Sequence, residues 1–188
     1  MVSSSSWGGL RFVTGNKNKV REAREILGVE LEQAVLEGAY EIQTSDLGEL
    51  VRHKAEQAYR ALRVPVLVED SGLVFTAWNG LPGALVKWFE SSVGCGGMLN
   101  MLAGFADRGA LAQCCVAVHN GREIVIARGE VAGSIASEIR GTGGFGWDVI
   151  FIPEGHDRTY GEMSAVEKNA ISHRRKAFAE LRKKISLE

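Results

Sequence analysis

Hydrophobic and polar positions in the first third of the chain predict an alternation of short strands and helices. Residues 10–14 form an apolar run typical of a strand, and residues 17–27 place their apolar side chains on one face of a helix that Gly28 ends. Residues 29–36 alternate roughly as a strand with one solvated face. Asp46 is positioned to cap a helix that runs to about residue 62.

The stretch VLVEDSGLVF, residues 66–75, begins as an apolar strand and then becomes polar. Its first three residues predict a buried strand that ends at Glu69, Asp70 and Ser71, and Gly72 predicts a turn there. A buried carboxylate is costly unless it is paired, hydrogen-bonded or bound to a metal. These residues are therefore candidates for catalysis, and a polar strand end followed by a turn is the structural alternative.

The middle of the chain predicts more strands and helices in alternation. A second strand is expected over residues 73–78, a helix after Pro82 and a short helix over residues 98–105. Asn120 and Gly121 stand between two β-rich runs and predict a hairpin.

The last quarter of the chain predicts a loop, a strand and a helix. A glycine-rich loop at residues 141–146 leads into a strand that Pro153 stops. Ser164 and Glu167 form a capping-box pattern for one long helix ending near Ile185. The whole pattern predicts an α/β fold with an elongated mixed β-sheet and flanking helices.

Composition narrows the class of protein. The 188 residues are 45% hydrophobic and 24% charged, and 22 basic residues nearly balance 23 acidic ones. This balance gives no broad electrostatic attraction for nucleic acid or for an anionic membrane. The three cysteines form no metal-binding spacing, and residues 1–9 contain no signal-peptide apolar segment. We therefore expect a cytoplasmic protein with a flexible tail at residues 1–9 and a single domain at residues 10–188.

The stretch FVTGNKNK predicts an anion site. A strand delivers Thr14 and Gly15 to a turn, Asn16 can cap the following helix, and Lys19 points back toward its N-terminus. The alternative is a glycine turn with solvated lysines.

The stretch GTGGFG matches the dinucleotide-binding spacing, but it lacks the preceding strand and following helix that this motif needs. Phe145, Trp147 and Asp148 suit a different task, because an aromatic ring can stack on a base and a carboxylate can accept from a base N–H. A core aromatic pair with a turn-forming aspartate is the alternative.

Several cations complete the set of candidate ligands: Lys54, Lys87, Lys168, His173 and Arg174. Each alone is typical of a surface or structural residue. Combined with the anion turn, the carboxylates and the aromatic loop, they favour binding of a nucleoside polyphosphate with a divalent metal.

Six segments carry a resemblance to a known family: FVTGNKNK, KAEQA, PVLVEDSGL, GLPGALVKWF, GGFGWDVIF and GEMSAVEKNAISHR. In their order and spacing, the sequence resembles the Ham1-type inosine triphosphate pyrophosphatases over essentially its whole length. The resemblance implies hydrolysis of non-standard purine triphosphates (ITP, dITP, XTP) to the monophosphate and pyrophosphate. It also implies Mg²⁺ or Mn²⁺ as cofactor, a homodimer, and two lobes with the active-site cleft between them.

By position, the resemblance assigns catalysis to Asp70, Glu69 and Lys19, and the metal to Asp70 and Glu41, with Asp46 as an open alternative to Glu41. It assigns the substrate contacts to Thr14, Gly15, Asn16, Lys17, Asn18, Lys19, Lys54, Asp70, Ser71, Lys87, Phe145, Gly146, Trp147, Asp148, Lys168, His173 and Arg174.

Base selectivity follows from hydrogen-bonding edges. Arg174, or amides near His173, would donate to a 6-oxo group and would meet the amino group of adenine donor to donor. Guanine must be excluded at its 2-amino group, by a residue that the sequence does not identify. A non-catalytic purine-nucleotide sensor, or a pyrophosphatase for another modified or pyrimidine nucleotide, remains an alternative.

Overall fold

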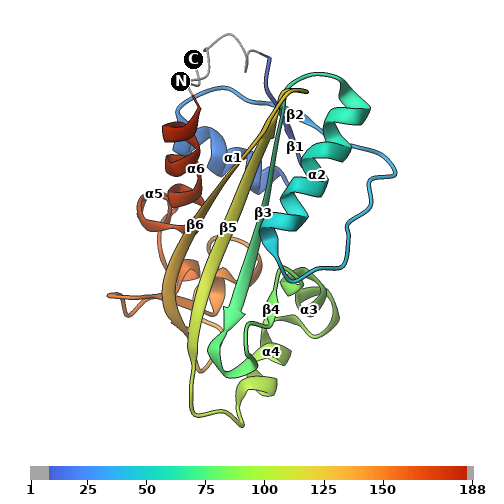
Figure 1. The fold of residues 1–188 in the computed structure, drawn as a ribbon. Coiled ribbons are helices and arrows are strands. Elements are labelled where there is room, and N and C mark those ends of the chain that lie inside the picture. The colour runs from blue at the N-terminus through green and yellow to red at the C-terminus, as the bar shows by residue number, and fades with distance from the viewer. Residues whose placement is uncertain (1–8, 186–188) are drawn as a thin grey trace.

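The computed structural model describes residues 9–185, and Figure 1 shows the arrangement of the elements. In chain order they are β1 (Arg11–Val13), α1 (Lys17–Leu27), β2 (Glu32–Ala34), α2 (Leu47–Leu62), β3 (Val66–Phe75), η2 (Thr76–Trp78), β4 (Pro82–Gly83), α3 (Val86–Ser92), α4 (Gly94–Leu102), β5 (Gly109–His119), β6 (Ile124–Ile135), η3 (Gly146–Val149), β7 (Phe151–Pro153), η4 (Tyr160–Glu162), α5 (Ala165–Ile171) and α6 (His173–Lys184). The predicted α/β class is confirmed.

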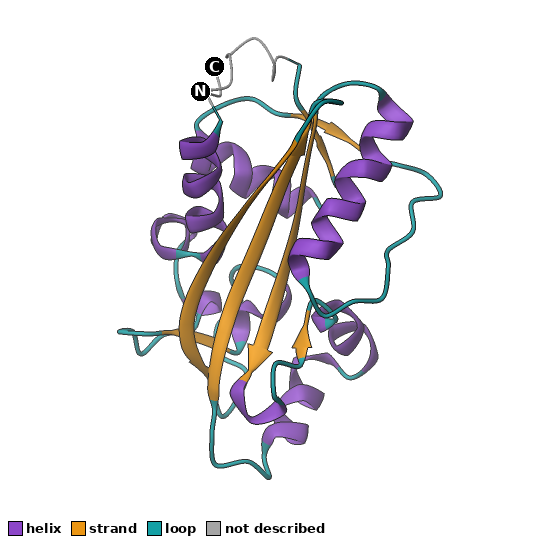
Figure 2. Ribbon diagram, viewed as in Figure 1, coloured by secondary structure: helices purple, strands orange, loops and turns teal. Residues whose placement is uncertain are grey.

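The described residues form one mixed sheet of seven strands in the order β2-β1-β3-β5-β6-β7, with β4 on the edge of β3. β1 pairs in parallel with β2 and β3, whereas the remaining pairs are antiparallel. The long strands β3, β5 and β6 run along most of the molecule, and helices flank them on both faces (Figure 2). The elongated mixed sheet with flanking helices is therefore confirmed.

Three apolar clusters fix the helices on the sheet. On one face, α1 and α6 pack around Leu67, and a second cluster forms around Leu73 with residues of α3 and α4. α2 packs on the opposite face around Val68. Strand alternation places Glu69 and Ser71 between the two clusters of the first face. The two clusters lie where two lobes would lie, but the division into lobes stays a prediction.

The predicted break at Gly72 is wrong. Residues 66–75 form one continuous strand that pairs with β5 over its whole length. Gly72 marks a close approach instead of a turn, because a Cβ there would lie 2.9 Å from the backbone carbonyl carbon and oxygen of Gly83. The expected second strand ends at Phe75, since Thr76–Trp78 form a 3₁₀ helix.

The helix expected after Pro82 begins later than predicted. Pro82 and Gly83 pair with β3 as the short strand β4, so the chain is extended there and α3 starts at Val86. The next helix, expected at residues 98–105, covers Gly94–Leu102. Packing of Met98, Leu99 and Leu102 in the apolar cluster holds this helix despite its three glycines.

The single long C-terminal helix is also wrong. Ser172, with extended backbone angles, ends α5 and caps α6, and its Oγ accepts a hydrogen bond from the amide of Arg175. The strand expected directly after the glycine-rich loop begins only at Phe151, because Gly146–Val149 form a 3₁₀ helix.

Other local predictions are confirmed. Asn16 and Asp46 cap α1 and α2, and the β5–β6 hairpin turns at residues 120–123. Cys114 and Cys115 are buried free thiols. Between residues 9 and 185, no helix has the length and apolar character needed to cross a bilayer. The tail predicted for residues 1–9 lies, except for Gly9, outside the described residues.

Candidate active site

The centre of the site is an open segment on the edge of β3. β1 pairs with β3 only at Val66 and Leu67, and β4 pairs with it only at Leu73 and Val74. The residues between them, 68–72, pair with neither strand on that edge. Glu69 and Asp70 lie in this gap, in mid-strand on a fully paired β5 partner. A rigid strand therefore holds both carboxylates, and the gap leaves room for helices to reach them.

Two lysines reach the gap from different helices. Lys19, in the first turn of α1, places its Nζ 3.0 Å from Glu69 Oε2 and 3.4 Å from Asp70 Oδ1. Lys54, from the middle of α2, places its Nζ 2.5 Å from Asp70 Oδ2. Burial would lower the pKa of each lysine, but the neighbouring carboxylates raise both values above the ordinary one. Both lysines are therefore firmly cationic.

Asp70 is ionised for the complementary reason. Burial would raise the pKa of its carboxyl, but Lys19 and Lys54 outweigh burial and hold that pKa below its usual value. Its Oδ1 also accepts from the Ser71 amide at 2.9 Å. An ionised aspartate with both oxygens on cations is a good cation ligand, but it is a weak base until those cations are drawn away.

Glu69 is fully enclosed, with Lys19 beside its Oε2 and three donors around its Oε1. Its Oε1 accepts from Ser71 Oγ at 2.5 Å, from Cys114 Sγ at 3.2 Å and from Arg174 Nη2 at 3.2 Å. Against burial, Arg174 and then Lys19 lower the pKa of Glu69 far below its ordinary value. Such a carboxylate has no free face toward a metal in this arrangement, and it orients Lys19 and Arg174.

The structure distinguishes between the two candidates for a second metal carboxylate. Glu41, on the loop between β2 and α2, lies 2.7 Å from Lys54 Nζ and shares that lysine with Asp70. Asp46 caps α2 and pairs with Arg128 at 2.9 Å, away from the residues that line the central cavity. Glu41 and Asp70 thus converge on one cation position, and Asp46 does not.

No set of three or more metal-ligating side chains occurs among residues 9–185. Mg²⁺ commonly uses only one or two carboxylates and takes its other oxygens from water and substrate phosphates. Glu41 and Asp70 supply that kind of donor set, since both are hard oxygen ligands that already face one cation. The residues present therefore fit a divalent ion that a triphosphate helps to hold.

The glycine-rich loop forms the other end of the site. Lys168 Nζ lies 4.7 Å from the centre of the Phe145 ring and the Arg174 guanidinium carbon lies 5.4 Å from it. Asp148 Oδ2 accepts from the Phe145 amide at 2.7 Å and from Lys168 Nζ at 2.6 Å. The loop thus presents a half-buried aromatic ring with two cations over it.

Trp147 and His173 are more deeply placed than Phe145. The Trp147 indole is buried against Phe151 and His173, at ring distances of 5.7 and 5.2 Å. Burial, then Arg174 and Lys168, lowers the pKa of His173 well below its usual value, so the imidazole is neutral. Neither of its ring nitrogens has a partner among the described residues.

A single cavity of about 780 Å³ joins the two ends. Apart from Asp46, the alternative metal ligand, every residue that the sequence analysis assigned to catalysis, substrate or metal lines it, including the Thr14–Lys19 turn and Lys87. The turn is built as predicted, with Asn16 Oδ1 accepting from the amides of Asn18 and Lys19 at 2.9 and 3.3 Å. The cavity is therefore lined by carboxylates and lysines at one end and by the Phe145 ring at the other.

The sequence pattern of the Ham1 family matches residues 10–184. The chain belongs to the Ham1 family.

Curated relatives and solved structures agree with this membership. The chain is 43% identical over 176 residues to the inosine triphosphate pyrophosphatase of Yarrowia lipolytica, covering 91% of this chain and 92% of the relative. It is also 43% identical over 171 residues to the dITP/XTP pyrophosphatase of Saccharolobus solfataricus, covering 89% and 88%. The structure of a HAM1 protein from Coxiella burnetii superposes with a TM-score of 0.80 at 30% identity, covering 93% of this chain and 96% of that one.

Two acidic residues of this Ham1-family site were missed by the sequence analysis. Glu22 of α1, which is buried, accepts from Lys168 Nζ at 2.9 Å and also pairs with Arg174. Glu90 of α3 lines the cavity beside Gly146. A signal was present for Glu22, because it lies three residues after Lys19 and four before Ile26, on the face of α1 that meets the site.

Proposed function

We propose that the chain hydrolyses non-standard purine nucleoside triphosphates (ITP, dITP and XTP) to the monophosphate and pyrophosphate, and so removes them from the nucleotide pool. The observation that carries the proposal is the single cavity that joins the Asp70 carboxylate and its two lysines to the Phe145 ring. A nucleoside triphosphate needs a polar end for its phosphates and an aromatic surface for its base. The names of the relatives at about 43% identity support the same reaction.

Binding would exchange one set of ion pairs for another. In the described structure, Lys19 and Lys54 neutralise Asp70. We propose that both lysines turn from Asp70 onto phosphate oxygens when the triphosphate binds, together with the amides of Gly15 and Lys17 in the Thr14–Lys19 turn and with Lys87 at the rim. Asp70 then loses its two lysine partners, which frees its oxygens for a metal ion and for the attacking water.

The reaction would begin with Asp70 accepting a proton from the water that attacks the α phosphorus, and the bond from this phosphorus to the α–β bridging oxygen would break to release pyrophosphate. Asp70 and Glu41 would hold Mg²⁺ or Mn²⁺, which when bound supplies charge neutralisation for the phosphates. Lys19, kept in place by Glu69, would stabilise the charge that develops on the pyrophosphate leaving group. Glu69 thus acts through Lys19.

Base recognition would use the other end of the cavity. The ring of Phe145 would stack on the purine. The N–H groups of Arg174, or amides near His173, would donate to a 6-oxo group and would find no acceptor at the 6-amino group of adenine. In the described structure Arg174 is held by Glu22, Glu69 and Ser71, with its Nε unpartnered among the described residues. We also propose that the chain forms a homodimer and works in the cytoplasm.

Product analysis tests the proposal. Purified protein with Mg²⁺ and inosine triphosphate should yield inosine monophosphate and pyrophosphate in equal amounts, resolved by ion-exchange chromatography. Adenosine and guanosine triphosphates should react about 5- to 150-fold more slowly, since one mismatched hydrogen bond costs about 1–3 kcal/mol. Free phosphate with inosine diphosphate would refute the reaction, because attack at the γ position gives those products. Nucleotide binding without any turnover would favour the sensor instead.

A further inference from the structure

Glu90 of α3 lies at the base end of the cavity and has no part in the mechanism above. It lines the cavity, and its Oε1 is buried without a hydrogen-bond partner among the described residues. Burial, and then the charge of Asp148, raises the pKa of Glu90 above its usual value. A buried acceptor without a partner is unfavourable, so its retention beside the glycine-rich loop needs a reason.

The two glycines that flank Phe145 each lie against a carboxyl group. A Cβ on Gly144 would lie 2.1 Å from Asp148 Oδ2, and a Cβ on Gly146 would lie 2.6 Å from Glu90 Oε1. Both glycines also have positive φ, at 69° and 63°. Any other residue would therefore meet a carboxyl group as well as backbone strain. The loop that carries Phe145 is fixed between two acidic side chains from different elements.

Contacts on the Gly146 side of the loop come from residues of α3 and α4. Besides Glu90, Cys95 of α4 places its Sγ 3.7 Å from the carbonyl oxygen of Gly146. On the Gly144 side, Asp148 bonds the Phe145 amide directly. The loop that carries Phe145 thus has neighbours on both sides, and only Asp148 belongs to the loop's own motif.

We infer that Glu90 is a positioning residue for Phe145: it fixes the Gly146 side of the base-binding loop as Asp148 fixes the Gly144 side. The inference rests on the proposed function, in which the purine stacks on Phe145. Glu90 acts through the position of the ring, so its effect belongs to base binding and not to phosphate chemistry. The loop packs against the bulk of this side chain at Gly146, so glutamine should replace it and alanine should not.

Kinetics with inosine triphosphate test this role. Glu90→Ala should raise KM roughly tenfold and change kcat by less than about threefold, because stacking contributes to ground and transition states alike. Glu90→Gln should stay within about twofold of the wild type, because glutamine keeps the size and shape of the side chain that lies against Gly146. Competitive inhibition by pyrophosphate, which lacks a base, should be the same in all three proteins.

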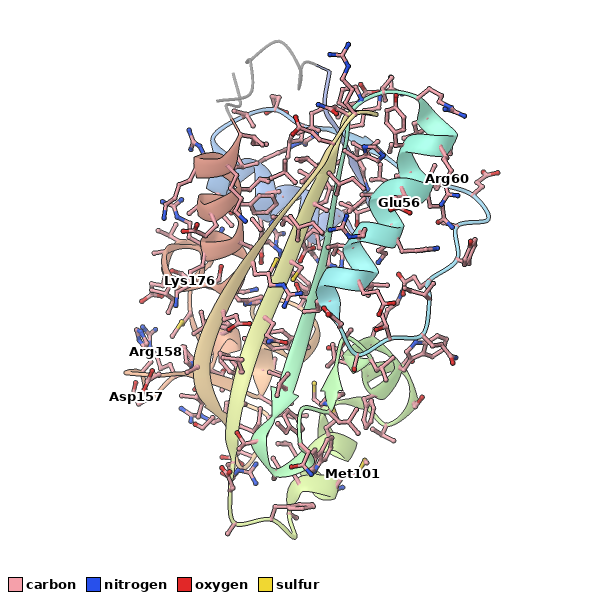
Figure 3. All side chains as sticks on the ribbon, viewed as in Figure 1. Glu56, Arg60, Met101, Asp157, Arg158 and Lys176 are labelled. Atoms are coloured by element: carbon pink, nitrogen blue, oxygen red, sulfur yellow. The ribbon has the colours of Figure 1, made fainter. Side chains whose placement is uncertain are left out.

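A double-mutant cycle separates positioning from a general structural effect. In a Phe145→Ala background, Glu90→Ala should raise KM no further, because the ring through which it acts is gone. Additive effects, or weakened pyrophosphate inhibition, would overturn the inference, as would an unchanged KM in Glu90→Ala. Thermal unfolding of each variant establishes that it is folded. Glu56→Ala, on the outer side of α2 in Figure 3, is the control for removal of a glutamate.

The wild-type assay keeps the two proposals distinct. If the wild type releases no pyrophosphate from inosine triphosphate, the proposed function fails. If the wild type is active and Glu90→Ala has an unchanged KM, only the role of Glu90 fails. Calorimetric binding of inosine monophosphate gives a readout without turnover: Glu90→Ala should weaken it roughly tenfold and Glu90→Gln should not. Equal affinities in all three proteins would overturn the role of Glu90.

Discussion

Replacing Asp70 with asparagine should separate catalysis from substrate binding, with effects of opposite sign. The change keeps the shape of the side chain and removes the charge that Lys19 and Lys54 now neutralise. With Mg²⁺ and inosine triphosphate, kcat should fall about 10²- to 10⁴-fold from loss of the proton acceptor alone, and weaker metal binding adds to that loss. The expected result for turnover is therefore near-complete inactivation.

Binding without metal should instead become tighter. Two unit charges about 4 Å apart interact by about 4 kcal/mol at an effective dielectric constant of 20. The side chains of Asp70 and Lys54 are 16% and 23% exposed, so solvent screening reduces this to about 1–2 kcal/mol. Since Asp70 competes with phosphate for both lysines, its removal should tighten metal-free binding of inosine triphosphate by about 5- to 30-fold.

The fold should tolerate this change. Lys54 keeps Glu41 at 2.7 Å, and Lys19 keeps Glu69 at 3.0 Å. Isothermal titration calorimetry in chelator measures the binding, and pyrophosphate release measures turnover. Asp46→Asn is the matched control, because asparagine caps a helix as well as aspartate does and Asp46 lies outside the cavity. Weaker metal-free binding, or turnover near wild type, would refute the role assigned to Asp70.

Three further predictions concern the base, the metal and acid stability. Phe145→Ala should raise KM for inosine triphosphate roughly 5- to 100-fold with a smaller change in kcat, and an unchanged KM would mean that the ring is only structural. Chelation should abolish turnover, Mg²⁺ or Mn²⁺ should restore it, and Glu41→Gln but not Asp46→Asn should raise the Mg²⁺ concentration that half-restores it. The pKa values of Glu22 and Glu69 are lower in the folded state than their ordinary value of about 4.5. Their ionised forms therefore stabilise the fold fully above about pH 4.5, and this stabilisation is lost as the pH falls from there toward the folded-state pKa values. The midpoint of thermal unfolding should therefore fall between about pH 5 and pH 3, and a midpoint that is constant over this range would contradict the assigned ion pairs.

Where the sequence predictions succeeded, the deciding interactions are local. The caps at Asn16 and Asp46 depend on amides two and three residues away. The turn at Asn120 likewise depends on the amides of residues 122 and 123. Such bonds form within one turn of chain, so spacing alone specifies them. The site motifs could also be identified from the sequence, and the structure brings them together around one cavity.

Where they failed, the deciding contacts are distant in sequence. A glycine at position 72 is compatible with a turn or with close approach of another backbone, and only the position of Gly83 decides between them. The capping box at Ser164 correctly starts a helix, but Ser172 then adopts an extended backbone that gives α6 its own N-terminus. This break puts His173 and Arg174 in the first turn of α6, facing the cavity.

The missed acidic residues show the same limit for the site. Glu22 was not identified from the sequence because its partners, Lys168 and Arg174, lie about 150 residues away along the chain. Glu90 has only Val86, one turn earlier, to indicate that its face of α3 is inward. Charged residues are normally exposed, so periodicity assigns them to solvent unless their partners are known.

These buried carboxylates explain how so many cations can stay beside one another before substrate binds. The cluster, defined by its ion pairs, contains Lys19, Lys54, Lys168, Arg174, Glu22, Glu41, Glu69, Asp70 and Asp148. Four basic groups around one cavity would repel one another, and five carboxylates offset that repulsion. Within this cluster, the ion pairs of Asp70 and Glu41 lie on the open side of β3, where these side chains are 16% and 43% exposed. The side chains of Glu22 and Glu69 are enclosed. A triphosphate can therefore displace the exposed pairs and leave the buried ones intact. The enclosed carboxylates keep the lysines and Arg174 positioned during that exchange, and this preorganisation lowers the cost of assembling charge around the transition state.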